Sequence, residues 1–159
     1  MIVFSNTTPM IALSSIDKLD LLPTLFNEIY VVEEVIEECA EGGKIIVPDL
    51  TKLDWLNIVK SVDGDSNAML MTLDKGEKHT LNMALKMKAN SVIIDEKMAL
   101  NIAEYLGLSV TGTLGVLLKA KQQGKISSFS ECARAMQEQG IYYNTKLLKK
   151  LALQIGEVF

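Results

Sequence analysis

Ile2-Val3-Phe4-Ser5-Asn6-Thr7-Thr8-Pro9 opens the chain with an apolar run that breaks into a polar turn. Such a short apolar run, bounded by turn residues, is typical of a buried strand. In a parallel sheet, the carboxyl ends of the strands border the crevice where ligands bind. We therefore expect Asn6 to lie at the edge of a binding site, with an amide where a carboxylate would hold a metal more strongly.

The chain has 159 residues, of which 48% are hydrophobic, and this is enough for one domain with a buried core over residues 1–159. No apolar run is long enough to span a bilayer, and the start lacks the pattern of a secretory signal, so we expect a cytoplasmic protein. Cys39 and Cys132 lie far apart in sequence, which favours two reduced thiols. The net charge of −4 argues against strong non-specific binding to DNA.

Short β-rich segments alternate with longer segments of helical period, which predicts an α/β fold with a parallel sheet, helices on both faces and right-handed crossovers. After the first strand, a helical stripe runs to Phe26, and we expect Pro23 to divide it. Asp63-Gly64-Asp65 predicts a turn, and Ser128-Phe129-Ser130-Glu131 predicts a capping box that opens a helical C-terminal part, residues 128–159. The other expected strands cover residues 29–32, 58–59 (weakly), 91–95 and 108–111, and the other expected helices cover residues 33–40, 74–87, 96–106, 112–123 and 144–155.

Several polar residues at the ends of these elements have a structural interpretation. Asn6 fits an N-cap of the first helix, and Asp95 fits an N-cap of the helix that follows it. Asp74 and Glu77 have the spacing of a capping box. The turn at residues 111–115 predicts a glycine turn with a threonine as helix cap rather than a phosphate loop, because it lacks both the GxGxxG pattern and the P-loop lysine.

Four stretches of the chain, in order, resemble the motifs of PIN-type domains, and more closely those of a subfamily of short PIN-like proteins. The family motifs are S-D-T-[ST]-P-L-I, G-E-A-E-A, I-D-[DE] and V-x-G-T-L-G, and the corresponding stretches are Ser5-Asn6-Thr7-Thr8-Pro9-Met10-Ile11, Gly76-Glu77-Lys78-His79-Thr80, Ile94-Asp95-Glu96 and Val110-Thr111-Gly112-Thr113-Leu114-Gly115. The resemblance implies a three-layer α/β/α fold with extra C-terminal helices. It also implies an endoribonuclease of single-stranded RNA that depends on Mg²⁺ or Mn²⁺, often a homodimer and often the toxin partner of an antitoxin protein.

The resemblance places the metal-binding acids of the family at Asn6, Glu77 and Asp95, with Glu37 or Glu38 as a further acidic neighbour. Hard divalent ions take oxygen ligands, so the acidic residues suit this role and Asn6 departs from it. Two unit charges about 4 Å apart interact by about 4 kcal/mol at an effective dielectric constant of about 20, so the missing charge weakens metal binding. We therefore expect an impaired nuclease site.

The second glutamate of the G-E-A-E-A motif falls on His79, the only histidine, which we expect to be exposed on the surface. Candidate contacts to RNA or phosphate are Thr7, Thr113 and Lys97. If they flank the crevice, two basic clusters form an RNA track: Lys119, Lys121, Lys125, Lys146, Lys149 and Lys150. Two alternatives stay open, namely a regulatory PIN-like domain that binds RNA or protein without catalysis, and a Rossmann-like nucleotide binder.

Overall fold

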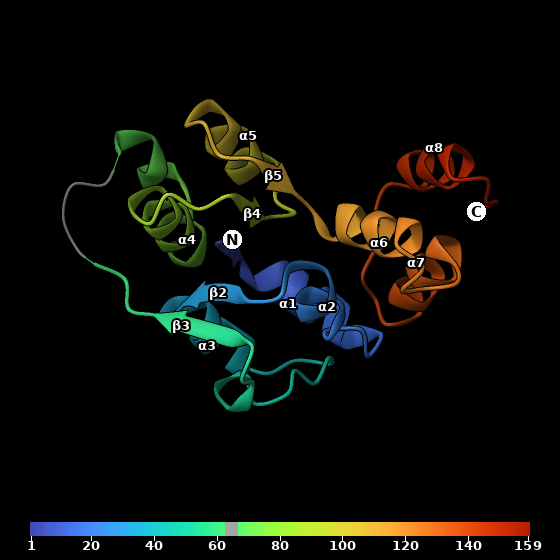
Figure 1. Cartoon of the computed structure of the whole chain (residues 1–159), viewed down its shortest axis with the longest axis horizontal. Helices are drawn as coiled ribbons and strands as arrows, with labels where there is room; N and C mark the ends of the chain where they lie inside the picture. Colours follow the sequence, from blue (N-terminus) through green and yellow to red (C-terminus); the bar gives the residue numbers. More distant parts are fainter. Residues whose placement is uncertain (63–66) are drawn as a thin grey trace.

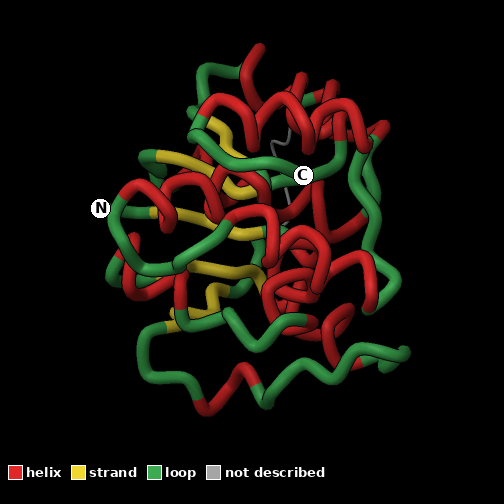
Figure 2. The backbone as a smooth tube through the Cα atoms, turned by 90° about the vertical axis from the view of Figure 1, so that its right-hand side faces the viewer, coloured by secondary structure: helices red, strands yellow, loops and turns green. Residues whose placement is uncertain are grey.

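A parallel sheet forms the centre of the computed structural model, which describes residues 1–62 and 67–159. Within these residues, five strands are arranged in the order β3-β2-β1-β4-β5, and each neighbouring pair is parallel. The strands are β1 (Val3–Ser5), β2 (Ile29–Val32), β3 (Leu56–Val59), β4 (Ser91–Ile93) and β5 (Val110–Thr111). Figure 2 shows these strands stacked between helices on both sides. The predicted three-layer α/β fold is confirmed.

The helices follow the strands in the predicted alternation (Figure 1). They are α1 (Thr7–Ser15), α2 (Leu21–Phe26), α3 (Glu33–Ala40), α4 (Lys75–Lys86), α5 (Lys97–Tyr105), α6 (Thr113–Gln122), α7 (Phe129–Glu138) and α8 (Thr145–Gln154), with short 3-10 turns η1 (Leu50–Lys52) and η2 (Ala68–Thr72). The turn expected at Asp63-Gly64-Asp65 lies outside the described residues. None of the helices in the described ranges combines the length and the apolar character that crossing a membrane requires.

The central strand β1 is buried along its whole length, as expected for a parallel sheet that is covered on both faces. α4 packs against β1, β2 and β4, and α3 packs against both α1 and α4. The core is filled by large side chains from strands and helices alike, including Phe4, Leu13, Leu81, Ile93, Leu117 and Phe129, each less than 2% exposed. This packing fixes the ends of β1 and β4, where two candidate site residues follow.

Pro23 does not divide a helix, contrary to the prediction. α1 ends at Ser15, and Asp17 has φ 54°, while the N–H of Lys18 donates to the carbonyl of Leu13 at 2.9 Å. This left-handed residue with its returning hydrogen bond is the usual way to close a helix. Pro23 lies in the first turn of α2, where its missing N–H removes no helical hydrogen bond.

The C-terminal tail is attached to the start of α7 by Glu157. Its carboxylate accepts hydrogen bonds from the hydroxyl of Ser128 at 3.0 Å and from the N–H groups of Phe129 and Ser130 at 3.0 and 2.9 Å. Ser128 in turn accepts the N–H of Glu131 at 3.1 Å, so half of the predicted capping box is present. The other half, a hydrogen bond from the Ser128 N–H to the Glu131 side chain, is absent among the described residues, and Glu157 instead satisfies the next two N–H groups of the helix start.

Glu157→Gln should lower the stability of the protein in a pH-dependent way. Although burial opposes it, hydrogen bonding from Ser130, Phe129 and Ser128 lowers the pKa of Glu157 to about 2. Because the folded-state pKa is depressed from the ordinary 4.5, the stabilisation is complete above pH 4.5 and is lost as the pH falls towards 2. We expect urea unfolding at pH 7 to show a loss of about 1–2 kcal/mol, shrinking at pH 3.

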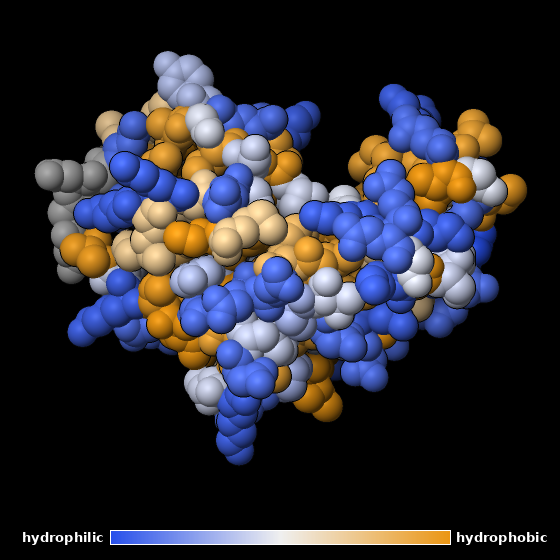
Figure 3. Space-filling model, viewed as in Figure 1, coloured by the Kyte–Doolittle hydropathy of each residue, from blue (hydrophilic) through white to orange (hydrophobic). Residues whose placement is uncertain are grey.

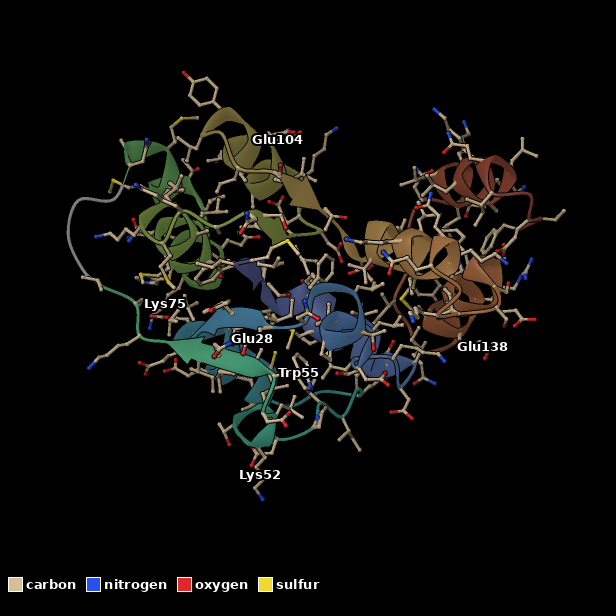
Figure 4. The ribbon with its side chains drawn as sticks, in the orientation of Figure 1. Glu28, Lys52, Trp55, Lys75, Glu104 and Glu138 are labelled. Atoms are coloured by element: carbon tan, nitrogen blue, oxygen red, sulfur yellow. The ribbon has the colours of Figure 1, made fainter. Side chains whose placement is uncertain are left out.

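Glu138→Gln is the matched control, because Glu138 is an exposed acid at the end of the same helix (Figure 4). It should change the free energy of unfolding by less than about 0.5 kcal/mol at either pH. Equal effects of the two substitutions at pH 7 would contradict the role given to Glu157.

Candidate active site

Asn6 lies where the two central strands end side by side. It follows β1 directly, and its N–H donates to the carbonyl of Ile93 in β4 at 3.0 Å. Asn6 occupies the N-cap position of α1, but its side chain makes no capping hydrogen bond, so the expected cap is absent. Its Oδ1 is buried and has no donor among the described residues. A buried acceptor without a donor is unfavourable, which points to a ligand for this atom.

Glu77 forms the predicted capping box at the start of α4. The N–H of Glu77 donates to Asp74 at 2.9 Å, and the N–H of Asp74 donates to Glu77 at 3.3 Å. The Glu77 side chain is also part of an acidic cluster, because burial, Asp74, Glu96 and Glu38 all raise its pKa, to about 7. The residue is only 7% exposed. Its structural and its candidate functional roles are therefore compatible.

Of the two acids of α3 that the resemblance suggests, Glu38 lies nearest to Glu77. The Glu38 carboxylate lies against Gly76, where the Cβ of any other residue would collide with it. Burial and Asp74 raise the pKa of Glu38, and the nearby Thr7 hydroxyl lowers it to a smaller extent. The Thr7 hydroxyl is buried near Glu38 but has no hydrogen-bond partner among the described residues.

Glu37 lines two adjoining cavities of about 320 and 300 Å³, and Glu38 and Asp74 of the acidic cluster also line the smaller one. Lys75 lines both cavities, and Asn6 lines neither. Lys75 is at the start of α4 (Figure 4). The structure therefore does not bring Glu37 together with Asn6.

Asp95 is held by three hydrogen bonds from two other parts of the chain. Its Oδ1 accepts the N–H of Thr113 at 2.7 Å, and its Oδ2 accepts the hydroxyls of Thr113 at 2.7 Å and Tyr143 at 2.8 Å. Asp95 is not the N-cap of α5, because Glu96 takes that position and accepts the N–H of Ala99 at 2.7 Å. That expectation is wrong.

The turn that begins α6 is built around Asp95. Contrary to the expectation, neither Thr111 nor Thr113 caps α6 with its side chain; Asp95, which follows the neighbouring strand β4, does so. A Cβ at position 112 would lie 2.9 Å from Oδ1 of Asp95, so Gly112 leaves room for the carboxylate. Because the Thr113 N–H already has an anionic partner, this turn is poorly suited to a nucleotide phosphate, which disfavours the Rossmann-like alternative.

Tyr143 is the site residue that the sequence did not indicate. It lies just before α8, 48 positions from Asp95 in the chain, and no motif connects the two. Burial, followed by the charge of Asp95, raises the pKa of Tyr143 well above its ordinary value. The phenol therefore stays protonated at neutral pH and donates a hydrogen bond to the Asp95 carboxylate.

His79 is not an exposed surface residue, contrary to the expectation. Its side chain is 14% exposed, and its Nε2 lies 3.7 Å from Oε2 of Glu34, which also accepts the hydroxyl of Ser61 at 2.7 Å. This group lies between α3 and α4 and lines the larger of the two cavities that include Glu37.

The candidate RNA contacts divide into residues already engaged in the fold and residues open to solvent. Lys119 lies over the ring of Phe26 at 4.5 Å, and Lys121 donates to the carbonyl of Ser127 at 2.6 Å. Thr113 is fully buried and committed to Asp95. The exposed candidates are Lys97, Lys125, Lys146, Lys149 and Lys150. Figure 3 shows a hollow between the part of the molecule that carries α5 and the part that carries α8.

The oxygen donors at this edge of the sheet fit a hard divalent cation in kind but not in charge. Asn6 contributes an unpartnered amide oxygen, and Asp95 and Glu77 are carboxylates. Among residues 1–62 and 67–159, no three histidine, cysteine, aspartate or glutamate side chains are close enough to bind one ion.

Comparison with known proteins agrees with the fold and with the family that the motifs resemble. A family model described as PIN domain matches residues 2–157. The fold is similar to that of a PilT N-terminus domain protein from the hyperthermophilic archaeon Sulfolobus solfataricus P2, with a TM-score of 0.58 and 14% identity over 73% of this chain and 90% of the other. No curated protein matches the chain significantly.

Glu77→Gln should stabilise the metal-free protein at alkaline pH. The folded-state pKa of Glu77 is raised from 4.5 to about 7, so its contribution to stability is complete below pH 4.5 and is lost as the pH rises through 7. Glutamine keeps an acceptor for the Asp74 N–H and carries no charge. Urea unfolding in EDTA at pH 8 should show a gain on the order of 1 to 3 kcal/mol, and at pH 5 a much smaller one.

Glu104→Gln on the exposed face of α5 is the control for this substitution (Figure 4). It should leave the difference between pH 5 and pH 8 unchanged. A Glu77→Gln protein with the same pH dependence as the unmodified chain would show that the acidic cluster does not strain the fold.

Proposed function

Because the chain belongs to the PIN-domain family, we propose that it is a divalent-metal-dependent endonuclease of single-stranded RNA whose metal site is weakened by Asn6. The observation that carries the proposal is the buried amide oxygen of Asn6, which has no described hydrogen-bond donor at the point where β1 and β4 end. A neutral oxygen there can act as a ligand, but it offers no charge to attract a cation or to offset the charge of a phosphate.

Each residue of this site has a specific task in the proposal. Asp95 presents its carboxylate in an orientation fixed by Thr113 and Tyr143. Burial and the neighbouring acids raise the pKa of Glu77 to about 7 in the metal-free protein, and a bound cation would favour the charged form of this carboxylate. A bound Mg²⁺ or Mn²⁺ would supply a Lewis acid for the scissile phosphate and would lower the pKa of water. Asn6 would bring a ligand oxygen into place without the charge that the family motif provides.

Asn6→Asp should restore the missing charge and increase both metal binding and RNA cleavage. A unit charge contributes about 4 kcal/mol to its interaction with another unit charge 4 Å away at a dielectric constant of about 20, and desolvation offsets part of this. We expect Mn²⁺ affinity, measured by calorimetry, to rise at least about tenfold, with a parallel rise in cleavage of a single-stranded RNA.

Asn27→Asp is the matched control, because it makes the same chemical change at an exposed residue that precedes β2, at the opposite edge of the parallel sheet. It should alter neither measurement. If Asn6→Asp has no effect on Mn²⁺ binding or on cleavage, position 6 does not limit the site and the proposed function is wrong.

A basic helix at the hollow supports RNA as the substrate. α8 carries three exposed lysines, Lys146, Lys149 and Lys150, and no acidic residue. Lys97 is exposed at the start of α5, and the part of the molecule that carries α5 borders the hollow opposite α8 in Figure 3. A strand of RNA lying between these helices would place its phosphates next to positive charge although the whole chain has a net charge of −4.

Replacing Lys146, Lys149 and Lys150 together by glutamine should weaken the binding of single-stranded RNA and flatten its dependence on salt. For single strands, each phosphate contact adds about 0.7 to the slope of log affinity against log salt, so the loss of three should lower it by about 2. Fluorescence anisotropy over a salt series measures this slope.

The same change at the exposed residues Lys44, Lys52 and Lys88 is the control, and Figure 4 shows Lys52 at the far side of the molecule from α8. The control triple variant should keep the original slope. Similar losses in both triple variants would show that RNA does not bind at α8.

The toxin-like setting is part of the same proposal and is supported by the family motifs. It implies a homodimer, a cytoplasmic location and an antitoxin protein as partner. Expression of the unmodified chain in a bacterial host should leave growth nearly unaffected, and expression of Asn6→Asp should slow it. Equal growth, together with equal RNA cleavage in vitro, would contradict this setting.

A second candidate is a PIN domain that binds RNA or protein without cleaving RNA. The observation that favours it is the saturation of Oδ2 of Asp95 by the hydroxyls of Thr113 and Tyr143. RNA binding that persists in EDTA, with no cleavage by either the unmodified chain or Asn6→Asp at millimolar Mn²⁺, would identify this function.

A further inference from the structure

Tyr143 connects the C-terminal helices to the candidate site. It lies in the segment between α7 and α8, and its ring packs against the hydrophobic core while its hydroxyl donates to Oδ2 of Asp95 at 2.8 Å. The preceding residue, Tyr142, is 73% exposed. Of these two adjacent tyrosines, only Tyr143 is therefore placed to act on the carboxylate.

The hydrogen bonds to Asp95 leave its two oxygens in different states. Oδ2 accepts two hydroxyls, from Thr113 and from Tyr143, which occupy both of its lone pairs. Oδ1 accepts only the N–H of Thr113 among the described residues, and it packs against Gly112, whose missing side chain leaves room for the carboxylate. One lone pair of Oδ1 is thus available, and the carboxylate can bind a cation through a single oxygen.

We propose that Tyr143 is a positioning residue, which holds Oδ2 so that Oδ1 of Asp95 is the atom presented to a divalent cation. The proposal rests on the proposed function. Hydrogen bonds behind a metal-binding carboxylate fix its orientation, and their loss typically lowers metal affinity by about 10- to 100-fold. The segment between α7 and α8 is then part of the site.

The placement of Tyr143 also connects the cation site to the basic helix. α8 begins at Thr145, two positions after Tyr143, and Lys146 follows in its first turn.

Calorimetric titration with Mn²⁺ alone tests the proposal, in the unmodified chain and in Asn6→Asp. Adding Tyr143→Phe removes one hydroxyl and should weaken Mn²⁺ binding about tenfold. Adding Tyr142→Phe, the matched control, should leave the affinity unchanged. Thermal melting in EDTA and circular dichroism accompany each variant, because a merely structural role would lower the melting temperature without a selective loss of Mn²⁺ affinity.

Four outcomes can occur. A selective loss in Tyr143→Phe supports the proposal. Unchanged Mn²⁺ affinity in Tyr143→Phe overturns it and leaves the proposed function intact, and tighter binding overturns it because the phenol would then obstruct the carboxylate. The absence of Mn²⁺ binding in both parent proteins overturns the proposed function and, with it, the role of Tyr143.

A second pair of variants keeps the test decisive if Tyr143→Phe does not fold. Thr113→Val removes the other hydroxyl from Oδ2, and Thr113→Ser retains it. Mn²⁺ affinity should fall about tenfold in the valine variant and be preserved in the serine variant. Equal affinities in these two variants would overturn the proposal.

Discussion

Parallel pairing of β1 with β4 is the constraint on which the site depends. Ser5 lies opposite Ile93, and the N–H of Asn6 continues the ladder to the Ile93 carbonyl at 3.0 Å. Two residues that are distant in sequence, Asn6 and Asp95, therefore leave the sheet at the same edge. Without this register, the amide at the start of α1 and the carboxylate before α5 would not lie at the same edge of the sheet.

Asp95 then connects the sheet edge to the rest of the domain. Its carboxylate caps α6 by accepting hydrogen bonds from Thr113. It also accepts a hydrogen bond from Tyr143, which lies just before α8. Glu157 makes a comparable connection from the chain end to the start of α7. In both cases a charged acceptor satisfies N–H groups that a helix start leaves without partners. The same interactions that hold the C-terminal helices in place thus determine which oxygen of Asp95 remains open.

Much of the fold follows from the sequence because hydrophobic period and capping residues act locally. The parallel α/β sheet, the helix at residues 33–40 and the capping box of Asp74 and Glu77 were all predictable for this reason. The sequence pattern predicts the helix break at Pro23, whereas α1 ends at Ser15, because the left-handed turn at Asp17 has no strong sequence signal. Hydrogen bonds between residues that are distant in the chain leave no local pattern, so the sequence does not predict them. Asp95 caps α6, Glu157 accepts N–H groups at the start of α7, and Tyr143 donates to Asp95 across 48 positions.

The central claim is that a divalent cation belongs at Asp95 and is held weakly because residue 6 is an amide. Crystals of the unmodified chain and of Asn6→Asp, soaked at the same Mn²⁺ concentration, test it through anomalous scattering at the manganese edge. We expect an anomalous peak in contact with Oδ1 of Asp95 and the side chain at position 6. This peak should be clearly higher in crystals of Asn6→Asp than in crystals of the unmodified chain. Peaks of equal height in the two crystals, or a manganese ion bound away from Asp95, would contradict it.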